Sequence, residues 1–173
     1  MEVTAQATSQ APDSETKTAS LPEYPEAGPL ALFRHMARVT LLLEALQEEC
    51  LSPFALRFVD YSVLRLLDYA GSPHRLSPSR LAEQVVCTTG GMTRILDRLE
   101  KRGLCERTRD PDDRRGVLVG LTEAGRQTSR RASEAYRNGR ERVLARLSAD
   151  EVEHLEASLQ RILEIFEEDR RQA

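Results

Sequence analysis

The sequence predicts a mainly α-helical protein whose β structure is one small hairpin, so that it is α+β by that hairpin alone. Apolar residues recur at helical spacing over most of residues 29–170. The apolar period changes to two over Leu104–Arg109 and again over Gly116–Leu121, which is the spacing of strands. Between these runs, Asp110-Pro111-Asp112-Asp113 supplies turn residues. A single hairpin among helices is therefore expected.

The overall composition limits the classes of protein to consider. The chain has 173 residues with 40% hydrophobic and 31% charged side chains, which favours one domain with a tail. No run approaches the roughly 18–20 apolar residues of a membrane span, and the opening residues lack the basic and apolar regions of a secretory signal. Cys50, Cys87 and Cys105 are far apart and form no CxxC motif. This pattern fits a reducing cytoplasm and predicts no structural metal and no cofactor.

Charge is distributed unevenly along the chain. The net charge of −3 argues at first against a nucleic-acid ligand. However, residues 122–146 contain seven Arg and three Glu, whereas residues 1–28 and 147–173 are strongly acidic. Local patches rather than the total charge set the field that a phosphate experiences, so a basic middle between acidic ends permits DNA binding. Arginine-rich helices that are merely solvated remain the alternative.

The first part of the chain predicts a tail and two helices. Residues 1–28 are rich in Ser, Thr, Ala, Pro and Glu without an apolar period, and we expect them to be disordered. A helix is predicted from Pro29 to about Cys50. Ser52-Pro53 interrupts the chain, and a second helix is predicted over roughly residues 59–70, ending at Gly71.

Two short helices and the hairpin follow. Ser77 and Pro78 are typical of a helix start, and Thr88 or Thr89 caps a second helix that runs to Arg102 before Gly103. The apolar stripe of that second helix consists of Met92, Ile95, Leu96 and Leu99, which we expect in the core. Two helices joined by a tight turn and followed by a hairpin constitute a winged helix-turn-helix. Two further helices are predicted after it, one capped by Thr122 and one opened by the capping box Ser148–Glu151.

The second short helix and the hairpin carry the residues expected to bind DNA. A helix in the major groove needs small or hydrogen-bonding residues at its N-terminal end, together with arginines for guanine or phosphate. The hairpin, or wing, places arginines at its tip, where the negative potential of a minor groove would attract them. The candidate DNA-binding residues are Thr88, Thr89, Gly90, Thr93, Arg94, Arg98, Arg109, Asp113, Arg114 and Arg115.

Three runs of sequence together resemble a known family. They are Gly90-Gly91-Met92-Thr93-Arg94-Ile95-Leu96-Asp97-Arg98-Leu99-Glu100, then Asp110-Pro111-Asp112-Asp113-Arg114-Arg115-Gly116, and finally Leu121-Thr122-Glu123-Ala124-Gly125. They resemble the MarR family of transcriptional regulators, most specifically over residues 76–125. The resemblance implies that Asp113 and Arg115 form a braced pair in the wing and that Arg114 is a candidate for the minor groove. Which of the two arginines enters the groove stays open.

The resemblance also implies an assembly and a domain organisation. It implies a cytoplasmic homodimer that binds double-stranded DNA at a palindromic operator and represses transcription until a small molecule or oxidation relieves the repression. The expected organisation is a tail (1–28), an N-terminal dimerisation helix with its linker (29–58), the winged helix-turn-helix lobe (59–125) and C-terminal dimerisation helices (126–173). The operator sequence, the regulated genes and an activating rather than repressing role are not determined by the sequence.

An effector site is expected near the first two helices. Family members often bind anionic aromatic molecules, and an aromatic wall with arginine suits a carboxylate. The candidates are Phe33, His35, Arg38, Phe58, Tyr61 and Arg65. Ordinary core and surface roles are the alternative for each of them. The absence of Trp argues against urate sensing, and Cys87 is either a redox-sensitive residue beside the DNA-reading helix or an inert thiol.

Two other classes of protein compete with this interpretation. An enzyme is not favoured, because no nucleophile elbow, P-loop, HExxH or dinucleotide fingerprint is present. A protein-interaction adaptor built on a winged helix is the stronger rival. A basic, glycine-bearing helix together with wing arginines favours DNA over that rival, because an adaptor has no need of them.

Overall fold

The computed structural model describes residues 28–71, 74–85, 87–111, 113 and 116–172. The predicted tail, apart from Gly28, lies outside these residues. The chain divides into two units, residues 1–38 and 39–173. The first unit contains the beginning of helix α1 (Pro29–Leu51), where Ala31 is buried while Leu32 and Phe33 are exposed. The second unit contains the rest of α1 and all the other elements.

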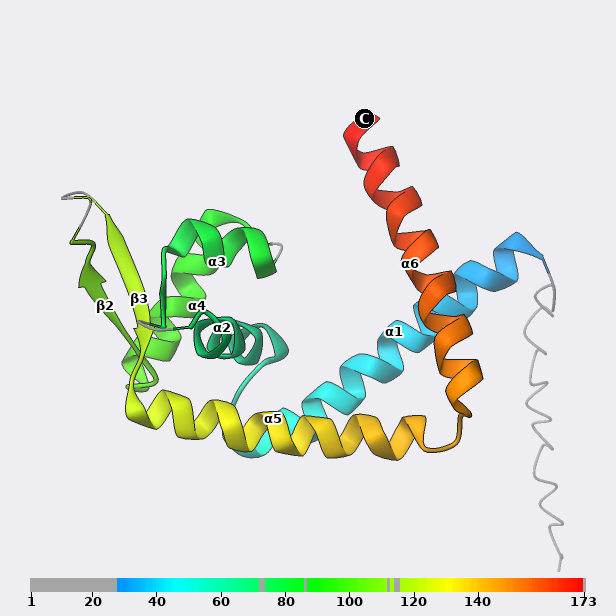
Figure 1. Ribbon diagram of the computed structural model, residues 1–173, viewed down its shortest axis with the longest axis horizontal. Helices are drawn as coiled ribbons and strands as arrows, with labels where there is room; N and C mark the ends of the chain where they lie inside the picture. Colours follow the sequence, from blue (N-terminus) through cyan, green and yellow to red (C-terminus); the bar gives the residue numbers. More distant parts are fainter. Residues whose placement is uncertain (1–27, 72–73, 86, 112, 114–115, 173) are drawn as a thin grey trace, which may run out of the picture. The chain divides into compact units, whose positions relative to one another are not determined.

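The helices of the second unit lie close to their predicted positions. A short 3-10 turn, η1 (Ser52–Phe54), stands where Ser52-Pro53 was expected to interrupt the chain. It is followed by α2 (Phe58–Tyr69), α3 (Pro78–Val85), α4 (Thr89–Lys101), α5 (Glu123–Leu144) and α6 (Ala149–Gln172). Gly71 and Gly103 have φ of 70° and 67°, the left-handed conformation that glycine adopts at a helix end. The predicted mainly α-helical fold is therefore confirmed (Figure 1).

The sheet has one more strand than the sequence predicted. The hairpin consists of β2 (Cys105–Arg109) and β3 (Val117–Leu121), with Cys105 opposite Leu121 and Arg109 opposite Val117. A two-residue strand, β1 (Arg75–Leu76), pairs antiparallel with the other edge of β3, so the order is β1-β3-β2. Two residues are too few to show an alternating pattern, which is why the sequence did not predict β1. Its pairing anchors the base of the hairpin to the segment that leads into α3.

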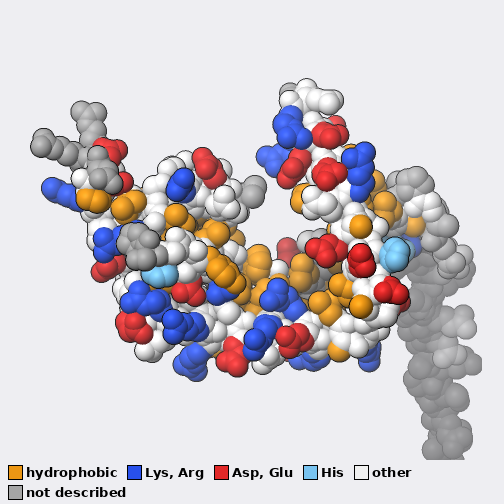
Figure 2. Space-filling view, viewed as in Figure 1, with side chains coloured by type: hydrophobic (Ala, Val, Ile, Leu, Met, Phe, Trp, Pro, Cys, Tyr) orange, Lys and Arg blue, Asp and Glu red, His pale blue; other side chains and the backbone are white. Residues whose placement is uncertain are grey.

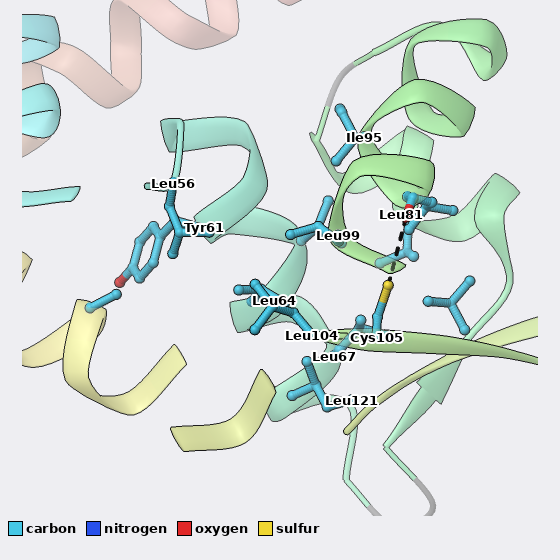
Figure 3. Close-up of a cluster of buried hydrophobic side chains, with 14 of the residues drawn as sticks. Leu56, Tyr61, Leu64, Leu67, Leu81, Ile95, Leu99, Leu104, Cys105 and Leu121 are labelled. Carbon is cyan, nitrogen blue, oxygen red and sulfur yellow. Dashed lines mark hydrogen bonds between the residues drawn. The ribbon is translucent and has the colours of Figure 1, made fainter. Parts of the chain in front are cut away.

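The core lies between α2, α3, α4 and the sheet. Leu64 and Leu67 from α2, Leu81 from α3 and Leu99 from α4 are completely buried. Figure 3 shows them converging with Leu104 and Leu121 at the base of the hairpin. The predicted core stripe of α4 is confirmed, since Met92, Ile95, Leu96 and Leu99 are all buried. This packing fixes the inner face of α4 and leaves its opposite face in solvent.

The passage from the hairpin into α5 depends on Thr122 and Gly125. The Thr122 hydroxyl donates to the Gly103 carbonyl (2.7 Å) and accepts from the Gly125 amide (2.9 Å), so it caps α5 and ties it to the end of α4. Any Cβ at residue 125 would overlap the Leu104 carbonyl oxygen. These contacts explain the physical need for threonine and glycine at this spacing.

Helix α6 begins at the predicted capping box. The Glu151 carboxylate accepts from both the amide and the hydroxyl of Ser148, at 2.8 Å each, and these two hydrogen bonds lower the pKa of Glu151. Along α6, Leu155, Leu159, Leu163 and Phe166 are about half exposed, and Figure 2 shows hydrophobic side chains at the surface there. A single chain thus leaves an apolar face of α6 in contact with solvent.

Candidate nucleic-acid interface

The N-terminal end of α4 presents small polar groups to solvent. Thr88 rather than Thr89 is the cap, because its hydroxyl accepts from the Gly91 amide at 3.1 Å. Thr89, Gly90 and Thr93 are exposed, and the Thr93 hydroxyl donates to the Thr89 carbonyl. A Cβ at residue 90 would meet no atom of the described chain within 4 Å. Backbone at Gly90 is therefore open to close approach by another molecule, and its contact with DNA stays a prediction.

Three arginines lie one turn apart along α4 and its C-cap, and their surroundings differ. Arg94 is exposed and has no hydrogen-bonding or ionic partner within the described ranges. Arg98 pairs with Asp60 of α2 through both carboxylate oxygens, with its Nε at 3.2 Å from Oδ2. Arg102, the C-cap residue, donates to two backbone carbonyls at the corner between α1 and α2. Only Arg94 presents an unengaged guanidinium at the outer end of the helix.

Asp60 gives Arg98 a structural role that the sequence did not reveal. The Asp60 carboxylate is 1% exposed and also accepts from the Arg57 amide at 3.1 Å, which caps α2. Arg98 supplies two more hydrogen bonds, so this buried carboxylate is paired as well as capped. A contact of Arg98 with DNA stays a prediction, and the structure shows its guanidinium already committed to α2. Sequence spacing carries no signal for a pair that is 38 residues apart.

The wing is described except at its tip. Arg109 is exposed at the end of β2, and Asp113 is exposed in the turn. The Gly116 amide donates to the Asp113 carbonyl at 2.8 Å, and the Asp110 amide donates to the Gly116 carbonyl at 3.0 Å. A Cβ at residue 116 would lie 2.8 Å from the Asp110 Cβ, so the turn requires glycine. Arg114 and Arg115 lie outside the described residues, and their expected minor-groove and bracing roles stay predictions.

Arg107 joins the wing to α4. Its guanidinium, on β2, pairs with Asp97 at 2.7 Å and with Glu100 of α4. These two carboxylates outweigh desolvation and raise the pKa of Arg107 above its usual value. The sequence carried no signal for this pair, because folding brings the residues of β2 and α4 together. The contact couples the root of the wing to the helix that carries Arg94.

A groove of about 600 Å³ lies beside the aromatic residues of α2 and α5. Phe58, Tyr61 and Tyr136 form a three-ring cluster with centroids 5.7–6.2 Å apart. Arg140 lies over the Tyr136 ring at 4.9 Å, and Arg65 lies over Tyr69 at 4.1 Å while pairing with Asp68. Three candidate effector residues, Phe58, Tyr61 and Arg65, thus line one groove. Sequence reasoning missed Tyr136 and Arg140, which come from a helix about 75 residues further along the chain.

The other candidate effector residues belong to the first part of α1. Phe33, His35 and Arg38 all have exposed side chains. Their role in binding a ligand stays a prediction.

The cysteines differ in their surroundings. Cys50 and Cys105 are buried, and Cys87, just before the cap of α4, is partly exposed. Burial, reinforced by the nearby Glu100 carboxylate, raises the pKa of Cys105 to about 11. Within the described residues, no group of three His, Cys, Asp or Glu side chains is arranged to hold a metal ion. Similarly, no described helix combines the length and apolarity needed to cross a membrane.

Comparison with known proteins identifies relatives of this sequence. The MarR family model matches residues 59–117. The multiple antibiotic resistance protein MarR of Escherichia coli is 33% identical over 136 residues, covering 78% of this chain and 91% of that protein. The HTH-type transcriptional regulator PecS of Dickeya dadantii is 29% identical over 134 residues, covering 78% of this chain and 81% of the relative.

Two solved structures are similar in fold to most of this chain. A mutant E. coli MarR in complex with operator DNA aligns with a TM-score of 0.70 and 31% identity, over 78% of this chain and 94% of that one. The transcriptional repressor CouR, bound to a 23-mer DNA duplex, aligns with a TM-score of 0.72 and 31% identity, over 82% and 99% of the two chains. Both structures contain DNA.

Proposed function

The chain belongs to the MarR family, and from this premise we propose that it acts as a homodimeric repressor of a palindromic operator. Membership makes it a DNA-binding transcriptional regulator and not an enzyme. Repression, dimerisation and response to a ligand are the proposed parts. A regulator of this kind acts where chromosomal DNA is, so the proposal also places it in the cytoplasm.

The observation that carries the proposal is the outer face of α4. Gly90 leaves backbone open at the helix N-terminus, Thr93 presents a hydroxyl, and Arg94 has an uncommitted guanidinium. Arginine reads guanine with two hydrogen bonds in the major groove, and small residues permit the approach that this requires. An adaptor would gain nothing from leaving this combination in solvent.

Dimerisation is supported by apolar side chains that one chain leaves uncovered. The later part of α1 exposes Leu41 and Leu42 by more than 60%, and α6 exposes Leu155, Leu159 and Leu163 by half or more. Exposed apolar surface of this kind marks a protein interface. A two-fold dimer then presents two copies of α4 to two half-sites about 10 bp apart.

Footprinting on the DNA immediately upstream of the chain's own gene tests the repressor proposal. We expect protection of a near-palindrome by a dimer, and loss of reporter repression when Arg94→Ala is introduced. Arg146→Ala removes the same charge from an exposed position beyond α5 and serves as the matched control. A monomer at micromolar concentration, or the absence of a protected palindrome, would contradict the proposal.

We further propose that the groove beside Phe58, Tyr61 and Tyr136 binds an anionic aromatic effector. Its three rings offer stacking surface, and Arg140 offers a cation that the described residues engage only through the Tyr136 ring. A carboxylate on an aromatic ligand fits this combination. Effector binding here contacts α2 and α5, the two helices that support the DNA-reading lobe.

Calorimetric titration with a panel of aromatic acids tests the effector site. We expect at least one acid to bind, to weaken operator binding and to lose affinity in Arg140→Gln. Arg137→Gln is the control, because Arg137 pairs with Glu134 and Glu141 and does not line the groove. Equal affinity of the two variants for the acid would contradict this assignment.

A further inference from the structure

Arg102 connects the end of the DNA-reading helix to the place where α1 ends. Its Nη1 donates to the Ala55 carbonyl at 2.6 Å and its Nη2 donates to the Phe54 carbonyl at 2.7 Å. The two accepting residues are 47 and 48 positions earlier in the chain. Among the described residues, no other side chain of α4 or its C-cap forms a hydrogen bond with the α1–α2 corner, which we define as residues 52–55.

The backbone carbonyls of the corner need a hydrogen-bond donor from outside the turn. It consists of the 3-10 turn η1 and Ala55, whose φ of 51° and ψ of 38° are left-handed. Carbonyls at the end of a helical turn lack a partner within that turn and attract positive charge. A guanidinium satisfies two such carbonyls with one planar group. Arg102 therefore stabilises a backbone conformation that a non-glycine residue adopts at a cost.

The corner is also fixed from α5 and from the core. Arg131 of α5 lies over the Phe54 ring at 5.7 Å. Leu51 and Leu56, on either side of the corner, are 0% and 3% exposed. The corner is thus a junction that contacts α5 and the core, and Arg102 attaches the C-terminal end of α4 to it. A change at Arg102 releases α4 from the junction while leaving the apolar face of α4 packed.

We propose that Arg102 is a positioning residue for DNA binding, which sets the orientation of α4 relative to the last turns of α1. This inference rests on the proposed homodimeric function. Where α1 contributes to the dimer, that orientation determines the separation of the two recognition helices. Arg102 therefore selects the half-site spacing that the dimer accepts, without touching a base.

The test measures binding of the full-length protein to operators whose half-site spacing is changed by one base pair in either direction. We expect the wild type to bind the altered spacings about tenfold more weakly or worse, the loss that a base mismatch typically carries. Arg102→Gln should reduce this discrimination to within about threefold, while its binding remains as dependent on salt as the wild type. Arg102→Lys, which serves one carbonyl at a time, should restore part of the discrimination.

Lys101→Gln is the matched control. Lys101 is the neighbouring exposed cation, and no described residue forms a hydrogen bond or ion pair with it. This variant should retain the spacing preference of the wild type. Thermal unfolding of each variant shows whether it is folded. If Arg102→Gln fails to fold, the spacing preference of Arg102→Lys is compared with that of the wild type instead.

Two results would overturn the positioning role. If Arg102→Gln keeps the spacing preference, Arg102 does not set it. If that variant instead shows a salt dependence reduced by about 0.9 per lost phosphate contact, Arg102 binds phosphate directly. A wild type that discriminates between no spacings contradicts the repressor proposal itself, so the two failures are distinguishable.

Discussion

At the scale of residues, Arg94, Arg98 and Arg102 show how one side-chain type acquires different tasks along one helix. They are separated by four residues each, so they follow one row of the helix surface. The outermost, Arg94, is free of partners among the described residues, whereas Arg98 and Arg102 bind Asp60 and backbone carbonyls. Their regular spacing in the sequence does not distinguish these tasks. Only the fold separates the arginine that is free for DNA from the two that hold the helix in place.

Substitution of Arg94 should affect DNA affinity and leave stability unchanged. Arg94→Ala removes a bidentate donor, so we expect a loss of about 1–3 kcal/mol in operator binding and a relaxed base preference at one position of each half-site. Because no described partner is lost, the melting temperature should stay near that of the wild type. Competition binding against single-base operator variants measures the preference. An equal loss on all sequences would make Arg94 a phosphate contact.

Substitution of Gly90 should change stability and DNA affinity in opposite directions. In Gly90→Ala the new Cβ meets no described atom within 4 Å, and alanine favours a helix over glycine by about 1 kcal/mol. The free protein should therefore become more stable towards denaturant. If Gly90 is at the interface as proposed, operator affinity should fall, because the added methyl group would keep the backbone away from the duplex. Increased stability with unchanged affinity would show that Gly90 is not at the interface.

Cys105 should react more slowly than Cys87 with a thiol reagent. Its pKa of about 11 means that the reactive thiolate is scarce near neutral pH, and the thiol donates to the Leu96 carbonyl (Figure 3). Because the folded pKa exceeds the unfolded value near 9, the thiol favours the folded state below pH 9, and this contribution is lost between pH 9 and 11. Alkylation of the native protein at pH 8, followed by peptide mapping, should find Cys87 modified before Cys105.

At the scale of elements, the sequence predicted helices well and contacts between elements poorly. The periods, caps and glycines of α1 to α6 are local signals, and Thr88, Thr122, Ser148, Gly71 and Gly103 all occupy their expected end positions. Strand β1 and the pairs Arg98–Asp60 and Arg107–Glu100 escaped prediction. Each depends on residues brought together by folding. The same limit applies to the groove, where Tyr136 and Arg140 joined the residues expected from α2.

The junction of β3 and α5 should tolerate no side chain at residue 125. In Gly125→Ala the Cβ overlaps the Leu104 carbonyl, so backbone must move, and we expect destabilisation of about 3 kcal/mol or more. Gly139→Ala is a useful comparison, because its Cβ would meet the Cys50 sulfur at 2.5 Å and the Leu46 side chain, which have more freedom to shift. Denaturant unfolding should give Gly125→Ala a lower free energy of unfolding than Gly139→Ala. The reverse order would show that the junction adapts more easily than α1 does.

At the scale of the whole molecule, apolar residues of α1 and α6 should form the dimer. Leu159 and Leu163 are 58% and 52% exposed in one chain, so charges there cost a monomer little. The double variant Leu159→Glu/Leu163→Glu should sediment as a folded monomer and lose cooperative operator binding. Arg161→Glu, on the same helix between them, controls for added charge. A variant that stays dimeric would place the interface elsewhere.

Removal of residues 1–28 should leave the dimer intact. The segment lacks an apolar period, and five of its six charged side chains are acidic. Its removal also takes negative charge away from the protein, so operator binding at low salt should strengthen slightly. Sedimentation and salt-dependent titration of the truncated chain measure both effects. Loss of dimerisation would show that this segment has a structural role.

The buried Asp60 carboxylate should couple local unfolding of α4 to local unfolding of α2. It is 1% exposed and receives hydrogen bonds from the Arg57 amide of the α2 cap and from Arg98 of α4. If α4 opened alone, it would leave this buried charge without its counter-ion, a state that costs several kcal/mol. Opening of α4 is thereby coupled to opening of the first turn of α2. In amide hydrogen exchange, the two segments should behave as one cooperative unit, so that the DNA-reading helix is as protected as the core that supports it.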